Sequence, residues 1–364
     1  MGLSGLAYNN HFTLLTSIDS SINIHPGIMI FGVIAGLLIS EKLEFMESAK
    51  IFNRFRISRI IIATLYPGIF LISYGITSNL NNVRIAGSIL IAISALLFFY
   101  FVIGPYSHGY SLIKLISGVS VISLALLAIL NDLKIITGST SMAVLALSFP
   151  IYYIIGERVE LGYVNRMKTK TIRLEGYISI IALISTVIFV LSSGLSTLAY
   201  MATGNIAIIL IIILAIISVK YDPAFRFIMK TKFKKTRLQG FMNTGVAIAY
   251  IWLFIGLMLY LVQIDIHRGF LDAATHSIAI GFIGTFIIAH SPVIFPLIFK
   301  KKANTNNLTY MPVIIITVST AMRVFGDIIA MVNVLGYWIS YISAYVLIIA
   351  IIAFFYNIMR IIKT

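Results

Sequence analysis

Two histidines, His276 and His290, lie fourteen residues apart in one stretch that is apolar enough to cross a membrane. In a regular α-helix, at about 100° per residue, the second histidine returns to within roughly 40° of the first and lies about 21 Å further along the axis. Ionisable groups inside a membrane are costly, and they favour a functional interpretation. Neutral imidazole is a common ligand of metals and of haem iron. We therefore expect both imidazoles to share one side of a helix and to bind a metal or cofactor.

A third histidine, His25, opens another apolar stretch and is followed by Gly32 and Gly36. In an α-helix these glycines would lie within about 20° of the direction of His25. Small residues in membrane helices usually indicate close helix packing. A groove lined by glycine below an imidazole would also admit a flat porphyrin. His25, Gly32 and Gly36 are therefore candidate cofactor-binding residues, with helix packing as the alternative for the glycines.

A charged pair, Arg323 and Asp327, interrupts a later apolar stretch. Residues four apart share one helix face, and each charge costs about 2.5–3.5 kcal/mol at the centre of a membrane helix unless it is paired. One interpretation is a self-neutralising structural pair. The other is that Arg323 binds a haem propionate through bidentate hydrogen bonds while Asp327 holds the guanidinium.

The composition indicates the elements that position these residues. The chain has 364 residues, of which 60% are hydrophobic and 11% charged, with a mean hydropathy of +1.02. These values are typical of an integral membrane protein rather than a soluble domain. We predict an all-α polytopic bundle of about eleven helices, each near the length that crosses a bilayer. The predicted spans are 26–40, 58–78, 84–104, 110–131, 138–156, 174–193, 197–218, 240–262, 272–299, 309–331 and 337–359.

The basic residues predict the orientation of the bundle. Counted over alternate loops, 23 Lys and Arg residues fall on one side and only Arg84, Lys134 and Arg268 on the other. The positive-inside rule then places the N-terminus outside and the C-terminus in the cytoplasm of a plasma-membrane protein. In this topology His25 and His276 lie at similar depth near the outer face, as does Arg323. Residues 1–364 are expected to form one integral membrane domain, with 1–24 as an extracellular segment.

Several classes of protein are excluded or disfavoured. The chain has no cysteine, which excludes disulfides, cysteine-ligated clusters and covalent c-type haem. The net charge of +15 follows the loops, so it favours a lipid partner and not nucleic acid. No cleavable signal peptide is expected, because the first 24 residues lack a basic segment followed by a long apolar one.

Two segments resemble the NnrS family of haem- and copper-containing multispanning membrane proteins linked to nitric oxide metabolism. The early family segment His-x-His-Glu-Met-x-Phe-Gly is similar to the stretch that begins at His25, with Gly27 in place of the second histidine. The later segment His-x-x-x-x-Gly-x-x-Gly-Thr matches the stretch from His276 to Thr285, and an Arg-Val pair matches Arg323 and Val324. The resemblance implies haem at His25 and His276, with copper as a further candidate cofactor.

The expected function is therefore that of a membrane protein with one or two b-type haems, in electron transfer or in redox chemistry of a small diatomic molecule. A first alternative is a quinol-linked cytochrome b subunit with haems stacked at His276 and His290, in which case quinone and other redox subunits are partners. The inner haem would then need a further ligand, such as His108. A second alternative is a transporter or structural subunit without haem. Whether the protein is an enzyme stays open.

Overall fold

The computed structural model describes residues 25–48, 55–103, 111–132, 138–164, 169–225, 236–266, 269–299, 301 and 306–363. Within these ranges the chain forms helices joined by turns, with no β-strand. The predicted extracellular segment 1–24 lies outside the described residues. The helices pack as two compact units, Met1–Leu214 and Ala215–Thr364, and each unit is described here by itself.

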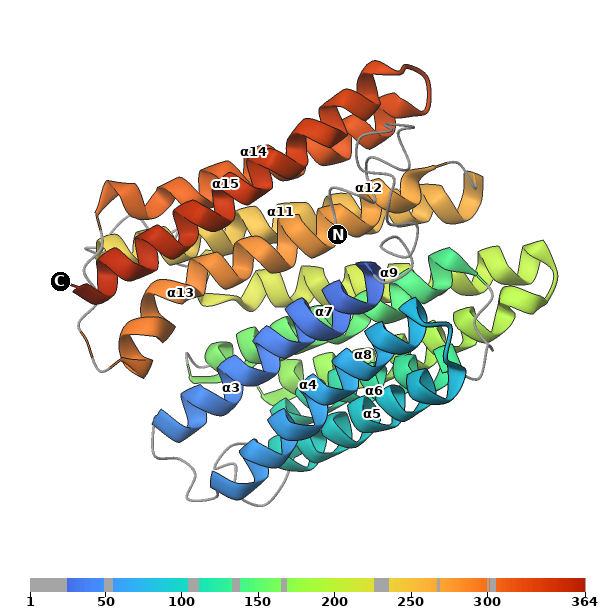
Figure 1. Cartoon of the computed structure of the whole chain (residues 1–364), viewed down its shortest axis with the longest axis horizontal. Helices are drawn as coiled ribbons and strands as arrows, with labels where there is room; N and C mark the ends of the chain where they lie inside the picture. Colours follow the sequence, from blue (N-terminus) through green and yellow to red (C-terminus); the bar gives the residue numbers. More distant parts are fainter. Residues whose placement is uncertain are drawn as a thin grey trace. The chain divides into compact units, whose positions relative to one another are not determined.

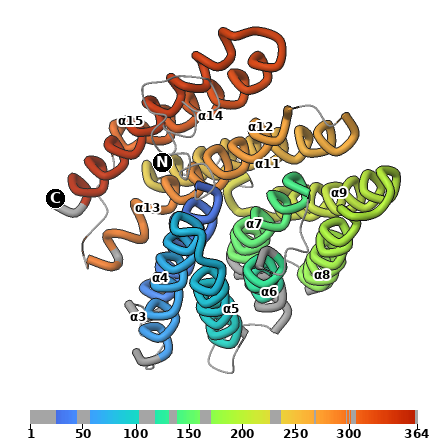
Figure 2. Tube along the Cα trace, turned by 45° about the vertical axis from the view of Figure 1, so that its right-hand side comes forward, coloured from blue at the N-terminus to red at the C-terminus, as the bar shows by residue number. Residues whose placement is uncertain are grey.

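The first unit is built from antiparallel neighbours. Its elements are η2 (Ile28–Ala35), α3 (Gly36–Ser48), α4 (Phe55–Thr77), α5 (Asn81–Ile103), α6 (Ser111–Asp132), α7 (Ser139–Val164), α8 (Thr169–Leu191) and η3 (Ser192–Gly194). Helix α9 (Thr197–Tyr221) runs across the boundary at Leu214. Helices α4 and α5 form a close hairpin (Figure 1), in which a Cβ at Gly68 would lie 2.9 Å from the Gly87 carbonyl oxygen. Figure 2 shows α6, α7 and α8 grouped beside one another, and the three pack pairwise.

The second unit holds the candidate residues His276, His290, Arg323 and Asp327. Its elements are α11 (Arg237–Ile266), α12 (Phe270–His276), η4 (Ser277–Gly284), α13 (Thr285–Ile298), η5 (Asn307–Tyr310), α14 (Met311–Ala330) and α15 (Leu335–Lys363). Segments α12, η4 and α13 follow without a break and form one helical path, which packs on α11 and α14. Helices α14 and α15 form a tight hairpin, visible as the last, red pair in Figure 1.

The predicted spans agree closely with the observed helices. Ten helices in the described part of the chain are long and apolar enough to cross a membrane. Helix α6, whose described apolar part is Gly118–Leu130, occupies the position of the eleventh predicted span. The fold class is therefore confirmed as an all-α polytopic helix bundle, and the chain is a multi-pass membrane protein.

Two of the expected α-helices contain π-helical segments of eight residues each. Segment η2 begins three residues after His25, and η4 begins at the residue that follows His276. A π-helix closes i→i+5 hydrogen bonds, so each turn holds more residues than an α-helical turn. Such segments are rare and are frequent at functional sites. Both lie directly after histidines that the sequence singles out as ligands.

Candidate functional site

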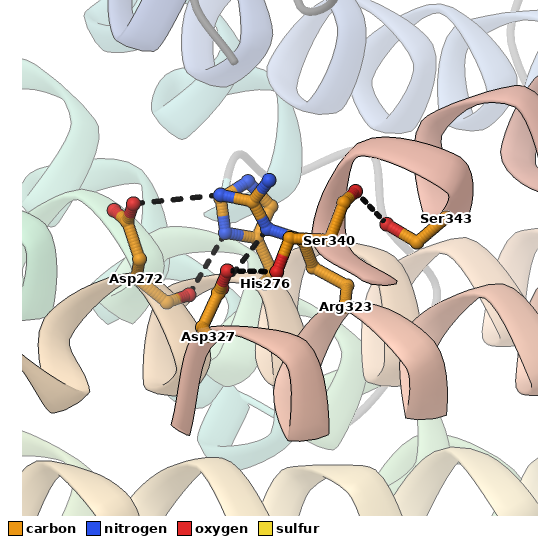
Figure 3. A network of polar contacts seen from close by, with 6 residues as sticks. All are labelled: Asp272, His276, Arg323, Asp327, Ser340 and Ser343. Carbon is orange, nitrogen blue, oxygen red and sulfur yellow. Dashed lines mark hydrogen bonds and ion pairs between the residues drawn. The ribbon is translucent and has the colours of Figure 1, made fainter. Parts of the chain in front are cut away.

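The centre of the site is Arg323, a buried guanidinium in α14 that faces two carboxylates (Figure 3). Its Nε lies 2.9 Å from Oδ2 of Asp327, one helical turn later, although this contact lacks hydrogen-bond geometry. Its Nη2 donates a longer hydrogen bond of 3.4 Å to Oδ2 of Asp272 in α12. The Asp327 side chain is 10% exposed and that of Asp272 is 54% exposed. Arg323 is thus held by one buried and one accessible carboxylate.

A row of serine hydroxyls supports Asp327 from α15. Ser340 Oγ donates to Asp327 Oδ1 at 2.7 Å, and Ser343 Oγ donates to the Ser340 carbonyl at 2.6 Å. Close approach of the two helices makes this possible, because a Cβ at Gly326 would lie 2.5 Å from Ser340 Oγ. The Ser340 hydroxyl orients the carboxylate, and the α14–α15 hairpin therefore fixes the position of the buried half of the ion pair.

Asp272 joins the ion pair to His276. The chain turns between α11 and α12 at Gly269, which has a positive φ of 47°, a conformation that glycine adopts readily. Asp272 then lies in the first turn of α12, where a negative charge is favoured by the helix dipole. Its carboxylate contacts Arg323, and its carbonyl oxygen accepts a 2.8 Å hydrogen bond from His276 Nδ1. Because Nδ1 donates, a neutral His276 carries its lone pair on Nε2, which would be the ligating atom in a metal complex.

The π-helical segment after His276 packs closely on α11. A Cβ at Gly281 would lie 2.5 Å from Trp252 Cγ, and a Cβ at Gly256 of α11 would lie 2.5 Å from Ile278 Cγ1. Ser277 Oγ donates a 2.8 Å hydrogen bond to the Trp252 carbonyl. Glycine is needed at both positions because any larger residue would overlap the facing helix. The close packing fixes the segment directly below the imidazole of His276.

His290 does not share the direction of His276, which corrects the first expectation. That expectation assumed a regular α-helix, but the eight residues of η4 lie between the two histidines. Because each π-helical turn holds more residues, the later part of the helix is rotated by roughly 100° or more relative to α-helical geometry. The His290 ring stacks on Phe286, with centroids 4.1 Å apart, and its Nδ1 donates to the Phe286 carbonyl at 2.9 Å. His290 thus has the same tautomer as His276, and it differs in that its ring lies against Phe286 of its own helix.

The third candidate ligand, His25, lies in the first unit and is partly buried. The glycines that follow it face α4: a Cβ at Gly32 would lie 3.5 Å from Ile69 Cγ2, and one at Gly36 would lie 3.5 Å from the Tyr66 hydroxyl. These are ordinary van der Waals distances. Side chains of α4 thus occupy the side of the helix that follows His25, where a porphyrin groove was expected from the sequence.

Two residues of the Arg323 network, Asp272 and Ser340, were not expected from the sequence. Asp272 begins the stretch that holds His276, and its acidic side chain inside a predicted span is the signal that marks it. Ser340 carries no such signal, because an isolated serine in an apolar helix is common. Within the described ranges, no three His, Asp or Glu side chains cluster as a metal-ligand set. His11, His108 and His267 lie outside the described residues.

Comparisons with curated proteins and with solved structures find no match to this chain. One family model does match, over residues 5–361, and its description is Domain of unknown function (DUF8744). The match covers all helices of both units. On this evidence the chain belongs to the DUF8744 family.

Proposed function

We propose that the protein is a plasma-membrane haem protein of the b type, in which His276 is an axial ligand. The observation that carries the proposal is the geometry of His276. Its Nδ1 is fixed by the Asp272 carbonyl, and an eight-residue π-helix begins at the next residue. A ligating histidine ordinarily donates its other ring N–H to a carbonyl or carboxylate, which fixes the tautomer. The resemblance of the His25 and His276 segments to the NnrS family supports the same assignment.

His276 has the tautomer that a haem ligand needs, whereas Arg323 is less suited to bind a haem propionate. In the interpretation from the sequence, a propionate was a further anionic partner of Arg323 besides Asp327. Asp272 of the same chain is that partner, at 3.4 Å. A propionate would therefore be a third negative group on one guanidinium. In the proposal Arg323 does not bind a propionate. It supplies a positive charge that is connected to His276 through Asp272, which contacts both residues.

A bound haem would supply one-electron redox chemistry or binding of a diatomic ligand. The protein residues would hold and tune it: His276 through its fixed tautomer, and Arg323 and Asp327 through their charges. His25 is a second candidate haem ligand on the resemblance alone. The proposal concerns haem; copper stays a further candidate cofactor on the resemblance alone. Quinone and other redox subunits are the proposed electron partners.

The cytochrome b alternative loses its main support. Two stacked haems on one helix require His276 and His290 to face the same side, and η4 rotates one away from the other. A transporter without haem is the second candidate, and the Arg323 network favours it. The buried Arg323 is shared between the buried Asp327 and the accessible Asp272. In such an arrangement an anionic substrate can replace the accessible carboxylate as the partner of the arginine.

Single histidine variants separate these functions. In purified protein, His276→Ala is expected to abolish or convert the haem spectrum, and His25→Ala to do the same, whereas His290→Ala keeps it. His290→Ala is the matched control, since it removes an imidazole from the same helical path. A wild-type spectrum in both His276→Ala and His25→Ala would reject the ligand assignment. If the folded wild-type protein contains no haem, the transporter is the candidate function that remains.

A further inference from the structure

The first unit contains a carboxyl group that the proposed function does not use. Glu175 lies in α8, inside the candidate membrane span Lys170–Gly194. Its side chain is completely buried, with 0% exposure. Five residues from the start of the span correspond to about 7–8 Å along the helix axis. Glu175 therefore lies about one and a half turns from the first residue of this candidate span.

Neither carboxyl oxygen of Glu175 has a hydrogen-bond partner among the residues that the structure describes. An ionised carboxylate without a partner in an apolar interior is far too costly, and such a group becomes neutral instead. The bundle thus holds Glu175 as a carboxylic acid. A buried acid kept only for packing would be expected to donate to a fixed acceptor, because an unmade hydrogen bond costs about 1–3 kcal/mol.

Buried hydroxyl groups continue from Glu175 along the same face of α8. Ser179 and Thr186 have 0% exposure and stand four and eleven residues further on, which covers about 16 Å of the helix. The completely buried Tyr152 of α7 has its hydroxyl beside Thr186. Helix α6, which also packs on α8, contributes the fully buried hydroxyls of Ser120 and Ser123. Ser179 and Thr186 donate to the carbonyl oxygens of Glu175 and Ala182 in their own helix, each at 2.8 Å. The hydroxyls thus leave the Glu175 carboxyl group itself without a partner.

The ionisable groups that the structure describes on α6 and α7 make no hydrogen bond to the Glu175 carboxyl. Helix α7 carries Tyr152, Tyr153, Glu157, Arg158, Glu160 and Tyr163, and the described apolar part of α6, Gly118–Leu130, contains no ionisable residue. Glu157 is already paired with Lys42 of α3 at 2.7 Å. The Glu175 carboxyl therefore avoids an uncompensated charge by keeping its proton.

We propose that Glu175 is a proton-binding site in the helical interior of the first unit. The side chain takes up a proton as the acid and releases it when a positive charge or water reaches the α6–α7–α8 interior. This proposal does not depend on haem, because Glu175 is not among the proposed haem ligands.

Infrared difference spectroscopy of the protein in lipid vesicles tests the site. On going from acidic to alkaline buffer, the wild-type protein is expected to lose the carbonyl bands of its titrating carboxyl groups, and the band of Glu175, identified by its loss in the variant below, should shift in deuterated water. Glu175→Gln is expected to remove the band. Glu157→Gln, the same substitution at an ion-paired residue of α7, is expected to keep it.

Three results would overturn the proposal: a band that survives in Glu175→Gln, a band that does not change with pH, and a band that does not shift in deuterated water. Should Glu175→Gln fail to fold, the wild-type protein still decides. Dicyclohexylcarbodiimide adds to protonated carboxyl groups in apolar surroundings, and peptide mass spectrometry is expected to find the adduct on Glu175. The adduct should decrease as the buffer becomes alkaline. Absence of the adduct at every pH would reject a titrating acid.

Discussion

The two carboxylates that hold Arg323 are expected to contribute very differently to stability. Unit charges 2.9 Å apart, as between Arg323 and Asp327, attract by about 6 kcal/mol at an effective dielectric constant of about 20. Desolvation offsets part of this attraction, and removal of one partner of a buried pair typically costs about 3–5 kcal/mol. Asp327→Asn keeps an acceptor for Ser340 and removes only the charge. We expect it to destabilise the second unit by about 3 kcal/mol, at the low end of that range.

Asp272→Asn is the matched comparison. The Asp272 side chain is 54% exposed and lies 3.4 Å from Arg323, so its interaction is screened and should contribute about 1 kcal/mol or less. The double variant Arg323→Gln, Asp327→Asn removes both buried charges. It is expected to be more stable than Asp327→Asn alone, because no uncompensated charge remains.

The assay is reversible unfolding in mixed micelles of increasing denaturing detergent, followed by tryptophan fluorescence. The chain has two tryptophans, Trp252 and Trp338, and both lie in the unit that contains the ion pair. Far-UV circular dichroism gives a second signal from the helices. Equal destabilisation by Asp272→Asn and Asp327→Asn would refute the assignment of Asp327 as the main partner. So would a double variant that is no more stable than the single one.

Three further predictions concern packing, orientation and charge. Gly281→Ala should destabilise the second unit by about 1–3 kcal/mol, because the added methyl group would overlap Trp252 of α11. Gly240→Ala is the control in the same unfolding assay: the nearest atom is the Tyr310 hydroxyl at 3.4 Å, so this variant should be neutral or stabilising. Because the chain has no cysteine, single cysteines report orientation cleanly: a membrane-impermeant maleimide applied to intact cells should label Ser196→Cys and not Lys301→Cys, and the reverse pattern would contradict an external N-terminus. Arg323→Gln should lower the haem midpoint potential in a redox titration, since reduction adds negative charge to a site that has lost its cation; an unchanged potential would limit Arg323 to a structural role.

The helices could be predicted from the sequence because hydrophobic length is enough to define a membrane span. The predicted span 197–218, for example, corresponds to Thr197–Tyr221. The π-helical segments could not be predicted in this way. Where nearly every residue is apolar, as in the stretch from Ser277 to Gly284, side-chain periodicity no longer distinguishes an α-helical turn from a wider one. The expected alignment of His276 and His290 was lost for this reason.

The pairing of Arg323 was predictable in part. Its partner Asp327 lies four residues away on the same helix, so local geometry predicts the contact. Asp272 is 51 residues distant in sequence, and only the packing of α12 on α14 brings it to the guanidinium. Glu175 was included in a predicted span without being recognised as a site. A single carboxyl in an apolar helix is a visible signal, but its lack of a partner depends on the three helices around it.

The measurement that tests the proposed function most directly is the haem content of the purified wild-type protein. A pyridine haemochrome assay, combined with a reduced-minus-oxidised spectrum, gives the number and type of haem per chain. The proposal predicts one b-type haem per folded chain, with the spectrum of a low-spin iron. Well-folded protein that contains no haem, and that takes up none when haem is added, would contradict it.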